Sequence, residues 1–153
     1  MKTLSIIRVD QKWLWRLFLA WALGGHKLKI APIDGLLFVS MTITFRGQSR
    51  LIDHLVLDTG ASHSVISMEL VDDMGIYGDV DDEIVVMHGI GGVERSIRKK
   101  IESIEFGTFK LSEVKLDFVN FDSHFGINGL LGADILTAGR FVIDLDAMEI
   151  YQK

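Results

Sequence analysis

The sequence predicts an all-β fold, a small closed β-barrel with one or two short helices. Aliphatic runs, alternating or continuous and separated by glycine-containing turns, recur from residue 36 to the end of the chain. With 153 residues, 48% of them hydrophobic, the chain suits one domain with a single packed core. From residue 36 onward, only residues 68–74 and the stretch between Gly132 and Gly139 resemble helices, and both are short. Closing the strands into a barrel would remove the exposed edges of the sheet.

The first predicted strands form a hairpin that leads to an acidic residue. Residues 37–45 alternate between polar and apolar side chains toward their end. Arg46-Gly47-Gln48-Ser49 is typical of a hairpin turn, and residues 51–57 return as an apolar strand. This second strand delivers Asp58.

A short helix and a long hairpin follow. Ser67 is expected to cap the helix over residues 68–74, and Gly75 is expected to close it. The pattern over residues 83–106 predicts a long hairpin with a glycine cluster at its tip. The remaining expected elements are a strand over residues 109–119 after the turn Gly107-Thr108, a helix between Gly132 and Gly139, and strands over residues 141–145 and 148–151.

The N-terminal residues 1–30 differ from the β-rich domain expected over residues 31–153. Residues 13–23 are apolar apart from one arginine, but spanning a membrane takes about 20 apolar residues. A cleavable signal, a membrane contact through this run, a helix packed on the domain and an extension without defined structure are the open alternatives. We expect a cytoplasmic protein, with membrane contact as a less favoured alternative. The nearest thing to a linker is residues 24–34, which hold the only proline.

Composition argues against several classes of function. The net charge of −5 disfavours a nucleic-acid partner, because phosphate binding needs clustered lysine and arginine. The one basic cluster, residues 95–100, is interpreted as the solvated face of a strand. The absence of cysteine excludes disulfides, thiol nucleophiles and cysteine-ligated zinc. The five histidines are scattered, so we expect neither a metal site nor a cofactor.

The most informative segment is Leu55-Val56-Leu57-Asp58-Thr59-Gly60-Ala61-Ser62. A carboxylate at the end of an apolar strand loses water, which penalises its charged form unless hydrogen bonds or a shared proton offset the cost. Thr59 supplies a hydroxyl for local bonding, and Gly60 has no Cβ where the backbone must turn. Asp58 is therefore predicted to have a role in catalysis. The plain alternative is a structural carboxylate that caps backbone N–H groups in a turn.

Two further motifs follow in order, Met87-His88-Gly89-Ile90-Gly91-Gly92 and Asn128-Gly129-Leu130-Leu131-Gly132-Ala133-Asp134-Ile135-Leu136. Together with Asp58-Thr59-Gly60-Ala61-Ser62, they resemble the retropepsin-like aspartic proteases, a family that includes retroviral proteases and bacterial relatives. The resemblance spans residues 36–145. The glycine-rich motif resembles the tip of the flap, the hairpin that closes over substrate in that family.

The resemblance implies an aspartic endopeptidase that acts on a polypeptide substrate. Peptide hydrolysis by carboxylates needs one ionised and one protonated group, and the chain holds a single Asp-Thr-Gly. A homodimer around a two-fold axis is therefore expected, in which two close carboxylates share one proton, as aspartic proteases do in general. The implied catalytic residues are Asp58, Thr59 and Gly60, and the implied substrate-binding residues are Ala61, Ser62, Ile90 and Gly91.

Each of these residues has an implied role. The Thr59 hydroxyl would bond across the dimer axis, and Gly60 would let the substrate backbone pass close to the carboxylates. Ala61 cannot donate a hydrogen bond to the carboxylate beside it, which predicts a mildly acidic to neutral pH optimum. Ile90 and Gly91 would lie over the substrate, with the glycine supplying the positive φ that a hairpin tip requires.

The chain also departs from the viral pattern. Many viral members have arginine where Ala133 stands and aspartate where Ser62 stands, an ion pair that braces the site and the dimer. Losing both partners avoids a stranded buried charge.

An alternative function is a retropepsin-fold module that binds peptides without cleaving them. Two competing sites are weak. His54 and Asp58 have a spacing of four residues, which suits a metal only on a helix, and this segment is a predicted strand. Ser62 and His63 are adjacent, and adjacent strand residues point to opposite faces, so they cannot form a serine-hydrolase triad.

Overall fold

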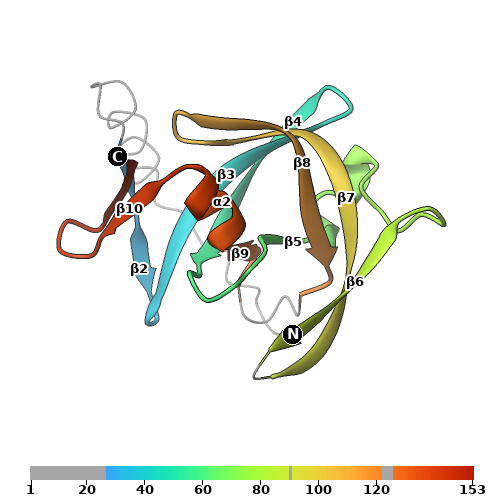
Figure 1. Cartoon of the computed structure of the whole chain (residues 1–153), viewed down its shortest axis with the longest axis horizontal. Helices are drawn as coiled ribbons and strands as arrows, with labels where there is room; N and C mark the ends of the chain where they lie inside the picture. The colour runs from blue at the N-terminus through green and yellow to red at the C-terminus, as the bar shows by residue number, and fades with distance from the viewer. Residues whose placement is uncertain (1–26, 90, 122–125) are drawn as a thin grey trace, which may run out of the picture.

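A computed structural model of the chain describes residues 27–89, 91–121 and 126–153. Figure 1 shows a β-rich molecule in which long, bent strands surround a common interior. Residues 13–23, the apolar run discussed above, lie outside the described residues. No helix in the described ranges is long and apolar enough to cross a membrane.

The larger sheet closes into a ring. Its strand order is β2-β3-β4-β9-β5-β8-β7-β6, and an additional pairing between β3 and β7 joins the two sides. These elements are β2 (Ala31–Ile33), β3 (Leu36–Phe45), β4 (Gln48–Leu57), β5 (Val65–Ser67), β6 (Glu83–Gly89), β7 (Gly92–Phe106), β8 (Phe109–Val119) and β9 (Gly129–Leu131). The expected all-β fold is confirmed.

A second, three-stranded sheet contains β1 (Lys27–Lys29), β11 (Glu149–Gln152) and β10 (Phe141–Asp144), in that order. β1 pairs antiparallel with β11 along its whole length. The described part of residues 24–34, the stretch nearest to a linker in the sequence, is therefore not a linker, because β1 and β2 have backbone partners. The folded part of the chain reaches at least to Lys27, inside the segment predicted over residues 1–30.

The turns between the long strands use the predicted residues. Arg46 and Gly47 have φ values of 50° and 74° and form the two-residue connection between β3 and β4. Positive φ at both positions gives a turn whose twist matches that of the flanking strands. Gly107, with φ of 63°, lies in the equally short connection between β7 and β8.

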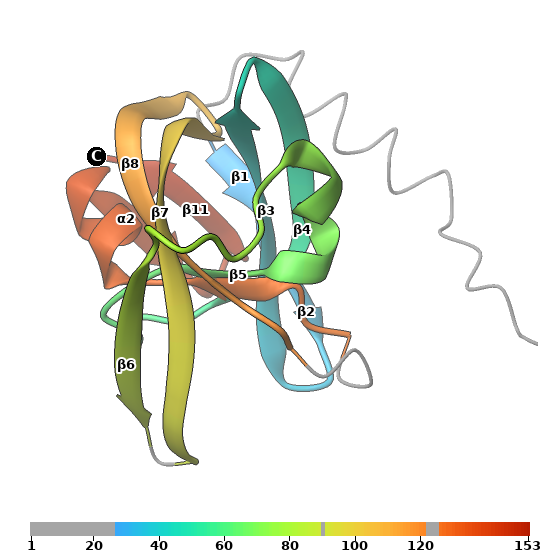
Figure 2. The same ribbon diagram turned by 90° about the vertical axis from the view of Figure 1, so that its right-hand side faces the viewer.

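The hairpin of β6 and β7 projects beyond the body of the molecule, as Figure 2 shows. Its strands pair from Glu83 with Arg98 to Gly89 with Gly92, as the sequence predicts. Gly92 at its tip has a positive φ of 129°, and the positive φ expected at Gly91 stays a prediction. Ile90 lies outside the described residues.

Of the two expected helices, the first is replaced by two short turns and the second is present as expected. Residues 68–74 form two 3-10 turns, η1 (Met68–Leu70) and η2 (Asp72–Met74), separated by Val71 with φ of −135°. The side chain of Val71 is fully buried in the core, and Ser67 makes no capping hydrogen bond. Gly75 closes the second turn with φ of 84°. The helix expected between Gly132 and Gly139 is α2 (Ala133–Ala138).

The core anchors the strands that lead to the predicted site. Leu55 and Leu131 are fully buried, and Leu57 is 9% exposed. Burying a leucine side chain contributes about 2 kcal/mol, so the ends of β4 and β9 are held firmly. These two strands run parallel, with Leu55 opposite Gly129 and Leu57 opposite Leu131. The Asp58 motif (residues 58–62) and the second glycine motif (residues 128–136) therefore lie side by side.

Candidate active site

Asp58 lies at the end of β4, where the loop over residues 58–64 begins. Its backbone N–H donates to the carbonyl of Leu131 at 3.0 Å, which ties the residue to β9. The side chain is half-buried, and its Oδ1 accepts a hydrogen bond of 2.9 Å from the Gly60 N–H. The carboxylate therefore has a fixed orientation and remains open to solvent on one side.

The residues after Asp58 line the open face of this loop. Thr59 and Gly60 are exposed, and a Cβ at position 60 would lie 3.2 Å from the Asp58 Oδ1. Ala61 is half-buried and Ser62 is exposed. The structure thus brings the predicted residues 58–62 together beside one carboxylate. Gly91 is exposed at the tip of the β6–β7 hairpin, outside this loop.

Ser62 and His63 contact each other, contrary to the sequence prediction. The Ser62 Oγ lies 3.1 Å from the His63 Nδ1, because the segment is a bent loop and not a strand. Among the described residues, His63 has no hydrogen bond to a carboxylate, so the pair lacks the third group of a serine-hydrolase triad. His54 lies on β4 as expected, and its Nδ1 is 3.4 Å from Asp53 and not paired with Asp58.

A network around Ser64 supports the loop from behind. Ser64 is 1% exposed, and its N–H and Oγ–H donate to the two carboxylate oxygens of Asp134 at 2.9 Å and 2.7 Å. The same Oγ accepts a hydrogen bond of 2.9 Å from the Gly132 N–H. Sequence reasoning missed this network, although the carboxylate of Asp134 at the start of α2 was a possible signal. Asp134 also accepts a bond of 2.8 Å from the Ile135 N–H.

The second glycine motif approaches the loop closely. The Ala133 N–H donates to the Ala61 carbonyl at 2.8 Å. A Cβ at position 132 would lie 2.8 Å from the His63 carbonyl carbon and oxygen, and 2.9 Å from the Ala61 carbonyl. Backbone atoms cannot move aside as a flexible side chain can, so glycine is required at position 132 for this contact.

Comparison with known proteins identifies the arrangement. A family model described as aspartyl protease matches residues 41–135, more than half of the chain, including Asp58 and Asp134. The chain belongs to this aspartyl protease family. A crystal structure of a retropepsin-like aspartic protease from Rickettsia conorii resembles it with a TM-score of 0.59 and 18% sequence identity, covering 82% of this chain and 89% of that chain. The fold of the aspartyl protease chain is accordingly retropepsin-like. No curated protein matches the sequence.

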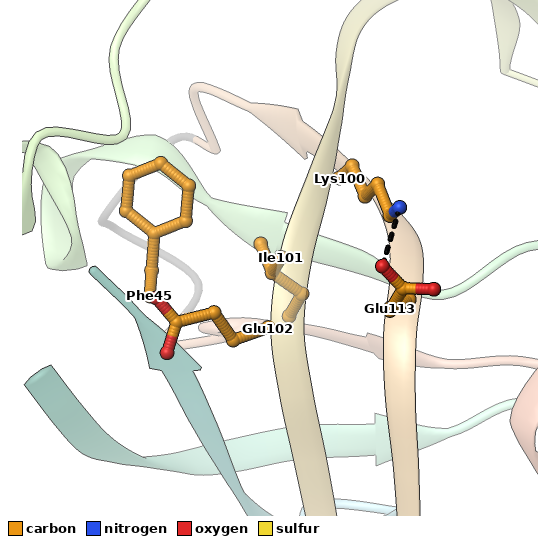
Figure 3. Close-up of a pocket in the computed structure, with 5 residues that line it drawn as sticks. All are labelled: Phe45, Lys100, Ile101, Glu102 and Glu113. Carbon is orange, nitrogen blue, oxygen red and sulfur yellow. Dashed lines mark hydrogen bonds and ion pairs between the residues drawn. The ribbon is translucent and has the colours of Figure 1, made fainter. Parts of the chain in front are cut away.

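A surface hollow elsewhere on this aspartyl protease is not part of the site. It measures about 260 Å³ and is lined by Phe45, Lys100, Ile101, Glu102 and Glu113, which Figure 3 shows around β7 and β8. Its lysine and Glu113 form an exposed ion pair of 2.8 Å. No residue of the Asp58 loop lines it. Within the described ranges, no cluster of three or more histidine, aspartate or glutamate side chains could hold a metal ion.

Proposed function

We propose that the chain is an aspartic endopeptidase that acts as a symmetric homodimer, in which the two Asp58 carboxylates activate one water. The observation that carries the proposal is the position of Asp58. Its carboxylate is open to solvent on one side and oriented by the Gly60 N–H at 2.9 Å, in a chain of the aspartyl protease family. The sequence holds only one Asp-Thr-Gly, so the second carboxylate would come from a second copy.

The chemistry follows from two carboxylates with one proton between them. Two negative charges at close range repel strongly, so one member of the pair stays protonated while the other is ionised. The ionised Asp58 would take a proton from water, and the protonated one would polarise the peptide carbonyl and later donate to the leaving amine. The bond from the Gly60 N–H at 2.9 Å would orient each carboxylate for this exchange.

The substrate in this proposal is an extended polypeptide. β6 is the last strand of the larger sheet, so one of its edges has no partner among the described strands. An extended peptide can add to such an edge through backbone hydrogen bonds, with alternate side chains giving specificity. The β6–β7 hairpin would act as the flap, with Ile90 and Gly91 at its tip above the peptide and Ala61 and Ser62 below it.

The test compares two aspartates of different placement. Asp58→Asn should lower cleavage of a denatured, fluorescently labelled protein by at least about 100-fold, because general acid–base catalysis contributes 10²–10⁴. Asp146, which lies exposed in the turn before β11, provides the control, and Asp146→Asn should cleave normally. Activity per chain should also fall on dilution, because dimer formation obeys mass action.

The outcomes separate the proposal from its alternative. A peptide-binding module without catalysis would give a wild-type chain that binds the denatured protein and leaves it intact. Cleavage that persists undiminished in pure Asp58→Asn would end the proposed mechanism. A monomer with concentration-independent activity would rule out the shared pair of carboxylates.

A further inference from the structure

A buried ion pair joins β7 to β8 at the base of the β6–β7 hairpin. The Arg98 Nε–H donates to the Asp117 Oδ1 at 2.7 Å, and its Nη2–H donates to the Oδ2 at 2.9 Å. The side chain of Asp117 is 1% exposed and that of Arg98 is 17% exposed. Such a bidentate pair fixes the relative orientation of both side chains.

The burial sets this pair apart from another ion pair on the same two strands. Lys100 and Glu113 also join β7 to β8, but their side chains are 59% and 76% exposed. Burying two charges costs desolvation, and apolar residues of similar size often stabilise a fold equally well or better. Stability alone therefore gives little reason for a buried charge at this position, which suggests that geometry is what the pair supplies.

Arg98 is also linked to the elements around it. Its Nη1 lies 3.8 Å from Glu83, the first residue of β6 and thus of the hairpin. The hydrogen bonds that Arg98 donates to Asp117 hold the pKa of Arg98 above its usual value, and the charges of Glu83 and Asp134 act in the same direction. The guanidinium therefore contacts β6 through Glu83 and β8 through Asp117.

Asp117 makes the connection to the Asp58 loop. Its backbone N–H donates to the Ser64 carbonyl at 3.4 Å, beside the parallel pairing of Val65 with Asp117. The Ser64 side chain in turn holds Gly132 and Asp134 behind the loop. One residue thus contacts the hairpin through its side chain and the loop through its backbone.

We propose that the Arg98–Asp117 pair is a positioning device, which fixes the base of the β6–β7 hairpin relative to the loop that carries Asp58. Neither residue is catalytic, since both act through the elements that they join. For catalysis the inference rests on the proposed protease function, because hairpin and loop would hold opposite sides of one bound peptide. The structural part of the inference does not rest on that function, because the hairpin and the loop are joined with or without cleavage.

The experiment replaces the pair without stranding a charge. The double variant Arg98→Met/Asp117→Leu should melt near the wild-type temperature, since apolar replacements of buried pairs are often neutral or stabilising. Amide hydrogen exchange should nevertheless accelerate by about 10-fold in residues 58–64 and 83–98, as local opening becomes easier. Strands β10 and β11 should keep their wild-type exchange rates. Lys100→Gln/Glu113→Gln, which removes the exposed pair of the same strands, should change none of these rates.

Kinetics supply the second readout. In the double variant, a misplaced hairpin should raise KM. It should also lower kcat/KM by about 10- to 100-fold, because small misplacements of reacting groups slow the reaction strongly. Wild-type exchange and kinetics in the double variant would overturn the proposal, as would an acceleration shared equally by β10 and β11. If the double variant does not fold, Arg98→Lys decides, since lysine keeps the charge and loses the bidentate fork. Unchanged exchange in Arg98→Lys would overturn the proposal equally. A wild-type chain that cleaves nothing would refute the protease function and leave the exchange test intact.

Discussion

Ser64 offers the sharpest test of how the Asp58 loop is held. Its side chain is 1% exposed and makes two hydrogen bonds in opposite directions. The Oγ–H donates to Asp134 at 2.7 Å, and the Oγ accepts from the Gly132 N–H at 2.9 Å. Ser64→Ala removes both bonds and keeps the Cβ, so it changes little in volume.

The magnitude can be worked out from these two bonds. A hydrogen bond to a charged acceptor contributes about 1.5–3 kcal/mol, and a buried N–H left without a partner costs about 1–3 kcal/mol. Ser64→Ala should therefore lower the free energy of unfolding by about 2.5–6 kcal/mol. For a domain of this size, the melting temperature should fall by about 10 °C. Gly132 is the residue whose N–H would be stranded.

The assay measures thermal unfolding by circular dichroism and cleavage of a denatured protein well below both melting temperatures. Cleavage should fall by about 10- to 100-fold, because Gly132 follows Leu131, whose carbonyl holds the Asp58 N–H. Ser62→Ala is the matched control for stability, since Ser62 is exposed and lies two residues away. If Ser64→Ala melts no lower than Ser62→Ala, the Ser64 network does not support the loop.

Three other predictions test separate features. Gly132→Ala should lower both the melting temperature and cleavage, because its Cβ would lie 2.8 Å from the His63 carbonyl; a wild-type melting temperature would contradict this. Hydrogen bonds from the two lysines of β1 hold the pKa of Glu149 below its usual 4.5, so its stabilising effect is present above pH 4.5 and lost as pH falls through the folded pKa. Glu149→Gln should therefore flatten the fall in melting temperature between about pH 5 and pH 3, and parallel curves would refute it. Ala61→Ser, by donating to the ionised Asp58, should shift the basic limb of the pH–activity profile toward acid, and superimposed profiles would exclude that role.

The long strands were predictable from the sequence because their signals are local. The strand expected over residues 109–119 is β8 at those bounds, since a period of two and a glycine turn at one end define it. Three of the three-residue strands were not predictable. β1, β5 and β9 have three residues each, too few for a periodic pattern. They exist because longer or adjacent strands offer them backbone partners, which is a tertiary effect.

The same distinction between local and long-range signals applies to the candidate site. Residues 58–62 are contiguous, so the sequence could predict them together, and the structure keeps them together in one loop. The bond between Ser64 and Asp134 joins residues 70 positions apart, and no local pattern announces such a contact. The error at Ser62 and His63 came from extending strand geometry past Asp58. The loop bends there, which brings the two side chains to the same side.

The support of the loop also bears on the missing ion pair of the viral pattern. Ala133 and Ser62 cannot form that pair, but the neighbouring Asp134 accepts two hydrogen bonds from Ser64 within the same chain. Neutral donors satisfy this carboxylate, so no buried cation is needed. Because the brace is intrachain, we expect each Asp58 loop to keep its geometry in the monomer. In the proposed homodimer, dilution should then abolish cleavage through loss of the second carboxylate, while amide exchange at Ser64 and Gly132, whose hydrogen-bond partners lie in the same chain, stays constant.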